Sequence, residues 1–348
     1  MKKYILPVIL FFAACGTGLA QTADGNDFAG KNMLIHHLDG STTKVDASTI
    51  EYIDFEDAEP VEPAEPKVGD YFYSDGTWSD GGLISIDANG TNPVWAEVKP
   101  VPMAGKTVIG IVCSVNPDRM AAADKEAGYT HGYVLACKNA FNPDRLIAGA
   151  PTTTVQWVLD ESYEATAVVK GCKSWYQNLD GRENTTTTLD LYGAEAAEKA
   201  PAFYYASTGF GVDAPAGTSG WFLPSTGQLW DAIANFCGND VATMMVDWQT
   251  ISYAVDYGYN DVNPAGENPL DMFNSVYSLV PAEDKDELVP GDSKHGYAMI
   301  WTSSRYSTEA GDEFNIGKAT VQANSKNLVE PYIEWFDGDA YARPMLAF

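Results

Sequence analysis

The clearest alternation of apolar and polar positions lies between residues 220 and 237. Four apolar residues there recur at i, i+3, i+4 and i+7, the spacing of one helix face: Leu229, Ala232, Ile233 and Phe236. Ser225 and Gln228 have the Ser-x-x-Gln spacing of a capping box, which predicts that the helix begins there. Gly238 predicts its end, since glycine is the commonest residue just after a helix. Pro224 disfavours the helical conformation in the residue before it, so the preceding tripeptide is predicted to be extended.

Nearer the N-terminus, residues 32–55 show the period-two alternation of strands. Met33-Leu34-Ile35 and Thr42–Val45 are separated by Asp39-Gly40, a hairpin signal, and Ile50–Phe55 alternates again. Residues 21–55 are therefore predicted to form a small β module. Residues 56–67 follow, alternating Pro and Glu with almost nothing to bury, so they predict an extended acidic linker.

The remaining region, residues 68–348, carries strand patterns near both of its ends and helical patterns between them. The strand patterns lie at 71–73, 77–78, 107–115, 132–138, 155–159, 297–303, 314–323, 332–336 and 341–348. The helical patterns lie at 118–127, 193–205, 225–237 and 269–279. This order predicts an α+β domain whose first and last strands belong to one antiparallel sheet.

The first residues have the pattern of an export signal. Lys2 and Lys3 precede an apolar run over residues 4–14, which is too short to span a bilayer. Gly18-Leu19-Ala20 fits a signal-peptide cleavage site, so residues 1–20 are predicted to be a signal peptide. Phe12-Ala13-Ala14-Cys15 is a competing, imperfect lipobox, and lipidation of Cys15 would attach the chain to the outer membrane. The chain is therefore expected at the cell surface, in the outer membrane or outside the cell.

Net charge and cysteine content limit which binding partners and which metal or redox sites are expected. The formal net charge of −27 repels phosphate, so nucleic acid is not expected as a partner. Cys113 and Cys137 lie in apolar strand patterns and are predicted to be buried thiols, whereas a bridge between Cys172 and Cys237 stays open. No cysteines or histidines have zinc or redox spacing.

Six motifs follow one another in an order that indicates a family. They are Asp70–Trp78, Ile109–Val112, Gly132–Lys138, Gly220–Pro224, Trp301–Ser304 and Arg343–Phe348. Together they resemble the Lcl C-terminal type of domain, found in secreted and surface proteins of bacteria and related in fold to C-type lectins and formylglycine-generating enzymes. The resemblance covers most of residues 68–348, and residues 32–55 resemble an N-terminal segment common in exported proteins of Gram-negative anaerobes.

The resemblance implies a C-type-lectin-like scaffold with long loops that bind a glycan or a surface protein. The calcium and sugar motifs of true C-type lectins, Glu-Pro-Asn and Trp-Asn-Asp, are absent, although Glu330-Pro331 keeps two letters of the first. The enzymatic relatives need a late pair of reactive cysteines, and this sequence has none after Cys237. Formylglycine-type catalysis is therefore not expected.

Aromatic residues among Asn, Asp and Gly in the late part of the chain suit a sugar or a protein partner. The predicted ligand-binding residues are Tyr257, Tyr259, Trp301, Arg305, Tyr306, Trp335 and Tyr341. For any single one of them, ordinary core and sheet packing is the favoured interpretation. Ser303 and Ser304 are expected to form hydrogen bonds at a strand end, and Arg343 to pair with a buried carboxylate. No cofactor is expected, with structural calcium at residues 87–92 or 260–263 as the open alternative.

The sequence therefore predicts a non-enzymatic secreted or cell-surface protein for adhesion or ligand binding. The alternative is a structural or tip subunit of a surface appendage, with residues 32–55 as an assembly strand. An oxidoreductase or hydrolase on the same fold is a third reading, for which no acid, base and nucleophile can be named. Ligand identity, oligomeric state and sequence diversification of the C-terminal region are not determined by one sequence.

Overall fold

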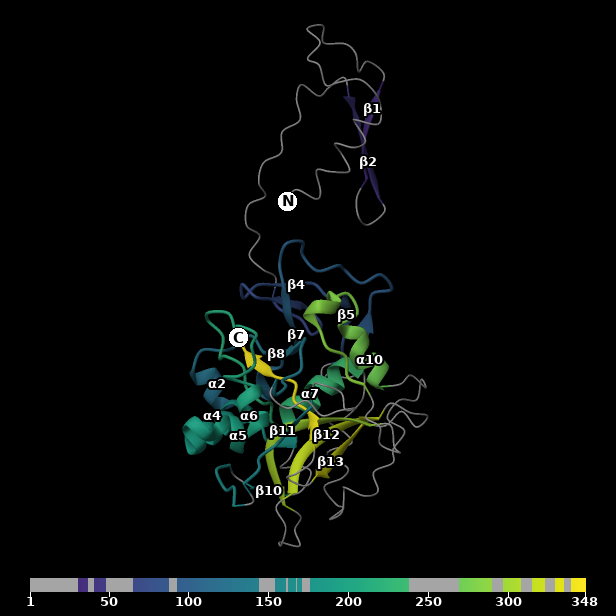
Figure 1. The fold of residues 1–348 in the computed structure, drawn as a ribbon. Coiled ribbons are helices and arrows are strands. Elements are labelled where there is room, and N and C mark those ends of the chain that lie inside the picture. Colours follow the sequence, from purple (N-terminus) through teal and green to yellow (C-terminus); the bar gives the residue numbers. More distant parts are fainter. Residues whose placement is uncertain are drawn as a thin grey trace. The chain divides into compact units, whose positions relative to one another are not determined.

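The computed structural model shows a chain of two compact units, residues 1–62 and 63–348 (Figure 1). The boundary falls inside the predicted Pro/Glu linker. The structure describes residues 31–36, 41–47, 65–87, 93–143, 154–160, 162–166, 168–170, 176–237, 269–289, 297–307, 315–322, 329–334 and 339–348. Each unit is considered separately below.

The first unit contains the predicted hairpin. Strands β1 (Asn32–His36) and β2 (Thr42–Asp46) pair antiparallel, with Asn32 opposite Asp46 and His36 opposite Thr42. Leu34 and Ile35 point to opposite faces of the strand, and both side chains are about two-fifths exposed, at 43% and 40%. The described residues therefore give the hairpin no buried face. The predicted strand at residues 50–55 lies outside the described residues.

In the second unit, the first and last strands lie in one five-stranded antiparallel sheet, as predicted. Its order is β15-β8-β7-β3-β4. The strands are β3 (Tyr71–Tyr73), β4 (Trp78–Ser79), β7 (Val108–Ser114), β8 (Tyr133–Ala136) and β15 (Met345–Ala347).

Both faces of this sheet are buried, which explains its near-continuous apolar strands. Along β7, Ile111 and Cys113 belong to one apolar core with helices α7 (Thr226–Cys237) and α10 (Pro269–Val276). Ile109 and Val112 belong to the other core, with helix α6 (Pro201–Tyr205). Gly110 lies where a Cβ atom would be 2.3 Å from a methyl carbon of Val134, so the strands approach too closely there for a side chain.

A second sheet is mixed and has the order β13-β12-β11-β14-β9, with β10 also paired to β11. Strand β11 pairs antiparallel with β12 but parallel with β10 and β14. The strands are β9 (Thr154–Gln156), β10 (Val168–Lys170), β11 (Tyr297–Ser307), β12 (Asn315–Gln322), β13 (Val329–Glu334) and β14 (Asp339–Tyr341). Strands β5 (Leu83–Ser85) and β6 (Val94–Trp95) form a separate pair.

Helices occupy the middle of the chain, as predicted. The short ones are η2 (Pro117–Arg119), α2 (Ala122–Glu126), η3 (Gly193–Glu195), α5 (Ala196–Lys199), α6 (Pro201–Tyr205) and η5 (Ala282–Asp284). The longer ones are α4 (Gly181–Tyr192), α7 (Thr226–Cys237) and α10 (Pro269–Val276). Pro201 begins α6, where the first turn needs no N–H, and thereby divides the predicted 193–205 helix. With several antiparallel strand pairs beside these helices, the unit is of the α+β class.

Helix α4 was not predicted, because its buried face is not apolar. The buried residues of α4 are Gly181, Thr185 and Thr188, and the threonine hydroxyls donate to carbonyl oxygens one turn earlier. Such a face has no hydrophobic stripe for a periodicity argument to find. Among the described helices, none combines the length and the apolar character needed to cross a membrane.

The predicted buried thiols are confirmed. Cys113 and Cys137 are free and fully buried. Burial raises the pKa of the Cys137 thiol to about 12, so it stays protonated at neutral pH. Cys237 is also buried, and its predicted alternative partner, Cys172, lies outside the described residues.

Candidate functional site

The 220–229 corner begins helix α7 with half of the predicted capping box. The Ser225 amide donates to Gln228 Oε1 at 2.9 Å, as a capping box requires. The Ser225 hydroxyl, however, donates to the carbonyl of Asn178 at 2.7 Å. The amide of Thr226 is satisfied by Ser304 Oγ of strand β11 at 2.9 Å. A distant strand therefore supplies part of the helix cap.

Strand β11 is hydrogen-bonded to this corner through three consecutive polar residues, Thr302, Ser303 and Ser304. The amide of Ser303 donates to the Pro224 carbonyl at 2.8 Å, and the hydroxyls of Thr226 and Thr302 are 3.1 Å apart. The pairing register of β11 with β12 shifts between Trp301 and Arg305, around these residues. Ser303 and Ser304 therefore form hydrogen bonds as predicted, but they lie within β11 and not at a strand end.

The C-terminal strand joins the same corner. Phe222 and Met345 exchange backbone hydrogen bonds of 2.8 and 2.9 Å, and the Leu223 amide donates to Thr185 Oγ1 of α4 at 3.1 Å. Three separate motifs of the sequence, Gly-Trp-x-Leu-Pro, Trp-Thr-Ser-Ser and Arg-Pro, therefore meet around one corner of the fold.

Arg343 has the structural role that was predicted, but with different acceptors. Its guanidinium is completely buried and donates to the backbone carbonyls of Ala136, Cys137 and Asp286 at 3.1, 2.7 and 2.8 Å. The guanidinium also lies 5.3 Å from the ring centre of Tyr277. Carbonyl oxygens thus take the place of the expected buried carboxylate, and Nε has no hydrogen-bond partner among the described residues.

Three of the predicted ligand-binding residues are interior residues. The indole N–H of Trp301 donates to the Val155 carbonyl at 2.7 Å, and that of Trp157 returns a bond of 2.7 Å to the Thr302 carbonyl. Arg305 donates to the Thr166 carbonyl, and the Tyr341 hydroxyl bonds the Val289 carbonyl. Their exposures are 0%, 4% and 3%, so in this structure Trp301, Arg305 and Tyr341 hold strands together and present no surface to a ligand.

The other predicted residues cannot be placed beside them. Tyr257, Tyr259 and Trp335 lie outside the described residues, as do residues 88–92 and 260–263 of the calcium alternatives. Tyr306 lies in β11, but its side chain is outside the described set. Within the described parts of the chain, no group of three or more His, Cys, Asp or Glu side chains is arranged to hold a metal ion.

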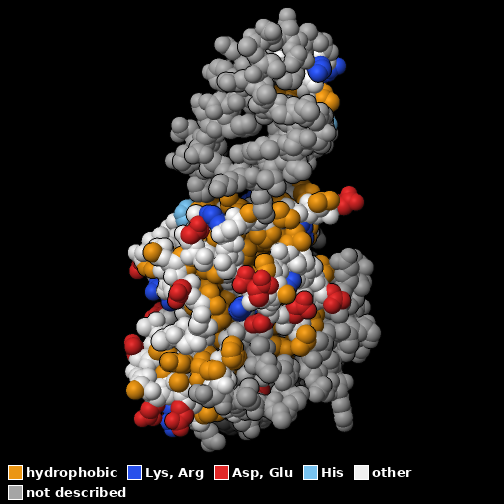
Figure 2. All heavy atoms as spheres, turned by 45° about the horizontal axis from the view of Figure 1, so that its top comes forward, with side chains coloured by type: hydrophobic (Ala, Val, Ile, Leu, Met, Phe, Trp, Pro, Cys, Tyr) orange, Lys and Arg blue, Asp and Glu red, His pale blue; other side chains and the backbone are white. Residues whose placement is uncertain are grey.

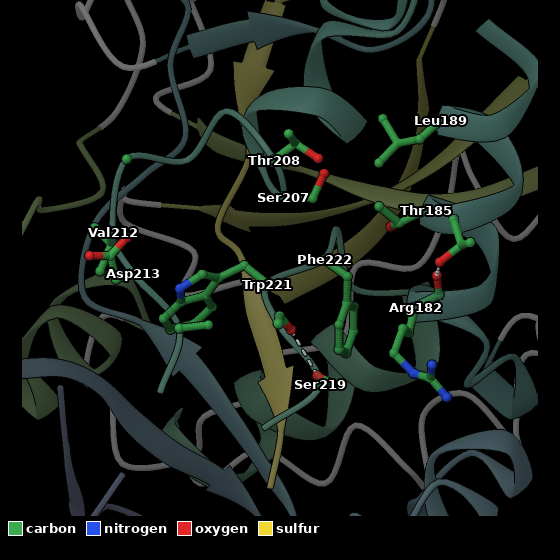
Figure 3. A pocket seen from close by; sticks show the side chains of 14 residues that line it. Arg182, Thr185, Leu189, Ser207, Thr208, Val212, Asp213, Ser219, Trp221 and Phe222 are labelled. Carbon is green, nitrogen blue, oxygen red and sulfur yellow. Dashed lines mark hydrogen bonds between the residues drawn. The ribbon is translucent and has the colours of Figure 1, made fainter. Parts of the chain in front are cut away.

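A pocket of about 470 Å³ opens beside the corner, between α4 and the loop that follows α6 (Figure 3). Its volume lies in the range of about 300–1,000 Å³ that is usual for small-molecule sites. One side is formed by Arg182, Thr185, Thr186 and Leu189 of α4, and the opposite side by residues 207–208 and 211–214. Ser219, Gly220, Trp221 and Phe222 of the corner complete the lining.

The charge of Arg182 is already matched within the protein. Its Nε donates to the buried carboxylate of Asp124, and its NH2 group donates to the Ala123 carbonyl at 3.0 Å. The other oxygen of Asp124 accepts from the Tyr133 hydroxyl at 2.7 Å. The positive charge of Arg182, at this side of the pocket, is therefore balanced by the Asp124 carboxylate.

Two polar groups of the opposite side are uncommitted within the described structure. Thr208 and Asp213 are both exposed, and neither side chain has a hydrogen bond or an ion pair to a described residue. Figure 3 shows Thr208 beside Ser207 and places Asp213 next to Val212 on the far side of Trp221.

Trp221 supplies a buried donor. Its side chain is only 7% exposed and packs edge to face on Phe210 with ring centres 5.3 Å apart. The indole Nε1 is buried and has no acceptor among the described residues. In Figure 3 this nitrogen lies on the edge of the ring that faces Val212 and Asp213. A buried N–H without an acceptor costs free energy, so this atom marks a place where an additional acceptor would stabilise the site.

The sequence reasoning singled out Gly-Trp-x-Leu-Pro as structure and missed the pocket. Arg182, Thr208 and Asp213 come from segments with no motif, and only the fold brings them beside Trp221. The glycines that precede Trp221 are the one feature of the sequence that could have pointed to the pocket. Gly211, Gly217 and Gly220 have φ between 75° and 85° in the structure, a conformation that favours glycine, and they form a tightly turned loop before the corner.

Comparison with known proteins gives one weak structural match. The chain matches no family model, and no curated protein matches it. One solved structure, titled a fimbrial protein from Bacteroides ovatus, has a TM-score of 0.43 and 16% identity. The match covers 81% of this chain and 49% of the other, so the chain spans about half the length of that protein. Likeness at this level does not extend the neighbour's role to this chain, and the C-type-lectin-like resemblance stays a prediction.

Proposed function

We propose that this chain is a non-enzymatic, exported surface protein that binds a glycan or a protein through the pocket beside Trp221. The observation that carries the proposal is the combination, in one pocket, of a buried unpaired indole N–H and two uncommitted exposed groups, Thr208 and Asp213. Pockets with apolar walls and a few convergent polar groups are the usual form of a binding site.

The surrounding polar groups favour binding over catalysis. Three hydroxyls of the pocket donate to backbone carbonyls: Thr186 to Arg182, Ser207 to Phe203 and Ser219 to Gly220. The uncommitted Thr208 hydroxyl has no base beside it among the described residues. A nucleophilic hydroxyl needs a base within hydrogen-bond reach, and these hydroxyls donate to carbonyls. The export pattern of residues 1–20 and the extended linker at 56–67 support a location at the cell surface.

A binding screen with a matched pair of variants tests this proposal. The purified chain from residue 21 onward is applied to an array that carries saccharides and surface proteins. Thr208→Trp fills the exposed side of the pocket and should abolish retention, while Thr187→Trp, on the exposed face of α4 outside the pocket lining, should retain the wild-type pattern. Absence of any retained component, or equal retention by Thr208→Trp, would count against the pocket.

A second function, as a subunit of a surface appendage, is favoured by the β1–β2 hairpin. Two short strands bury no apolar face among the described residues, and an isolated two-stranded hairpin has little stability in water. Pairing with a strand of a neighbouring subunit would cover it. Deleting residues 32–55 should then abolish incorporation into assembled appendages without changing the circular dichroism of the larger unit. Undiminished incorporation would rule this role out.

A further inference from the structure

The unpaired indole N–H of Trp221 requires an acceptor, whereas the Thr186 and Ser207 oxygens and the Asp213 carboxylate require donors. We infer that the pocket binds an uncharged, polyhydroxylated ligand, a neutral saccharide ring, with a sugar oxygen accepting from Trp221 Nε1. This inference rests on the proposed binding function and specifies its ligand class and contacts.

Several oxygen atoms of the pocket are left as acceptors, whereas the uncommitted Thr208 hydroxyl can donate or accept. Because Thr186 and Ser207 donate their hydroxyl protons to carbonyls at 3.0 and 2.5 Å, their remaining lone pairs face a ligand as acceptors. Asp213 adds a carboxylate, which accepts only. A ligand must therefore bring several donors for these oxygens and one acceptor for Trp221. Sugar hydroxyls supply both, whereas a protonated amine has donors alone.

The net charge of the site disfavours acidic ligands. The Arg182 charge is compensated by Asp124, so Asp213 is left as the uncompensated charge among the lining residues. The formal net charge of −27 adds a repulsive field, and acidic side chains are prominent on the face in Figure 2. An acidic sugar or a phosphate would meet this charge without a free cation from the pocket lining.

Apolar surface between the polar groups fits the carbon faces of a sugar ring. Leu189 projects from α4, while Val212 and the edges of Trp221 and Phe222 lie across the pocket from it (Figure 3). Aromatic residues with adaptable polar neighbours are the combination that suits such amphipathic ligands.

Nuclear magnetic resonance of the tryptophan indoles tests the inference at the atom it concerns. The chain has nine tryptophans, and the Trp221 indole signal is identified as the one missing from Trp221→Phe. The probes are methyl glucoside, N-acetylglucosamine and lactose as neutral sugars, glucuronic acid as an acidic sugar, and putrescine as an amine. Each is added at about 10 mM, ten times a Kd of about 1 mM. At least one neutral sugar should shift the Trp221 signal, and glucuronic acid and putrescine should leave it in place.

Two surface variants keep the test valid even where Trp221→Phe perturbs folding. Asp213→Asn should weaken binding of the active sugar at least about tenfold, or 1.4 kcal/mol, by removing a charged acceptor. The matched control, Glu195→Gln on exposed η3, should bind as the wild type does. A Trp221 signal that no neutral sugar moves overturns the inference, as does a signal moved by putrescine alone or by glucuronic acid alone.

The resonance experiment and the array together distinguish a wrong saccharide assignment from a failure of the proposed binding function. If the array yields a protein ligand that Thr208→Trp abolishes while all sugars leave Trp221 unmoved, the pocket binds but the saccharide assignment is wrong. If the array yields nothing, the binding function itself fails.

Discussion

At the scale of single residues, buried charged groups stabilise the fold, and among the described residues Arg343 is the most completely buried of them. Replacement by lysine removes the planar fork that reaches the carbonyls of Ala136, Cys137 and Asp286 together. Arg343→Lys should lower the free energy of unfolding by about 2–4 kcal/mol, because buried acceptors lose their donors. Urea unfolding measures the change. Lys125→Ala, at an exposed lysine, should cost less than about 0.5 kcal/mol, and an equal cost for both would contradict the assignment.

Asp231 predicts how stability depends on pH. Burial raises its pKa from 3.8 to about 6 and outweighs the ion pair with Arg119, whose Nε lies 2.8 Å from the carboxylate. The folded state therefore holds more protons than the unfolded state between about pH 4 and 6, and stability should fall as the pH rises through that window.

Asp231→Asn should remove the contribution of this carboxyl to the pH dependence of the free energy of unfolding. That contribution is up to about 3 kcal/mol for a pKa raised from 3.8 to about 6. Asp70, whose pKa burial also raises to about 6, should keep the remaining slope in the same direction. Urea midpoints at pH 4.5, 5.5 and 6.5 give the slopes for wild type and variant. A slope unchanged by Asp231→Asn would show that the carboxyl titrates as an exposed one.

Residue roles were predictable where a motif names its own geometry. Ser225 and Gln228 specify a cap, and the structure forms its Gln228 half. The roles of Trp301, Arg305 and Tyr341 were not predictable, because an aromatic or arginine side chain in a strand serves a core as well as a surface. Which face of a strand is covered depends on strands far away in the sequence.

At the scale of elements, the start of α7 is packed against the 176–178 segment without room for a side chain. A Cβ on Gly227 would lie 2.2 Å from the Tyr176 carbonyl oxygen and 2.6 Å from that of Asn178. Helix propensity alone predicts that Gly227→Ala stabilises the protein by up to about 1 kcal/mol.

The packing predicts the opposite sign for that substitution. Gly227→Ala should destabilise by more than about 2 kcal/mol, since backbone carbonyls must move to admit the methyl group. The control is Gly105→Ala. A Cβ atom at this position would lie in open space, so the substitution costs only the backbone strain of a φ of 79°, about 1 kcal/mol. Thermal unfolding of the two variants compares the costs, and a stabilised Gly227→Ala would refute the close contact.

Elements with a periodic apolar pattern were found from the sequence, and those without it were not. Helix α7 and strands β7 and β8 were predicted close to their observed bounds. Helix α4 was missed because threonines, not apolar residues, face the core. Strands β5, β6 and β10 have two or three residues each, too few to show a period.

At the scale of the whole molecule, the division at residues 62 and 63 predicts independent folding of the larger unit. A chain that lacks residues 21–62 should unfold within about 2 °C of the temperature at which the chain from residue 21 onward unfolds. The reason is that both apolar cores of the described structure consist of residues of the second unit. Scanning calorimetry measures this. A large fall in the unfolding temperature would show that the first unit contributes to the core.

The α+β class and the sheet shared by the first and last strands of the second unit followed from the order of elements, whereas the mixed second sheet did not. Its parallel pairs join β11 to β10 and β14, and no local pattern reports which distant strands become neighbours. The pocket was unpredictable for the same reason, since α4, the 207–214 loop and the corner meet only in the folded chain.

The most direct test of the account is a crystal structure of the chain with the ligand selected on the array. The account predicts ligand density in the pocket beside Trp221, with an acceptor atom within hydrogen-bond distance of Nε1 and contacts to Thr208 and Asp213. Ligand density at Tyr257, Tyr259 or Trp335, with the pocket beside Trp221 empty, would contradict it.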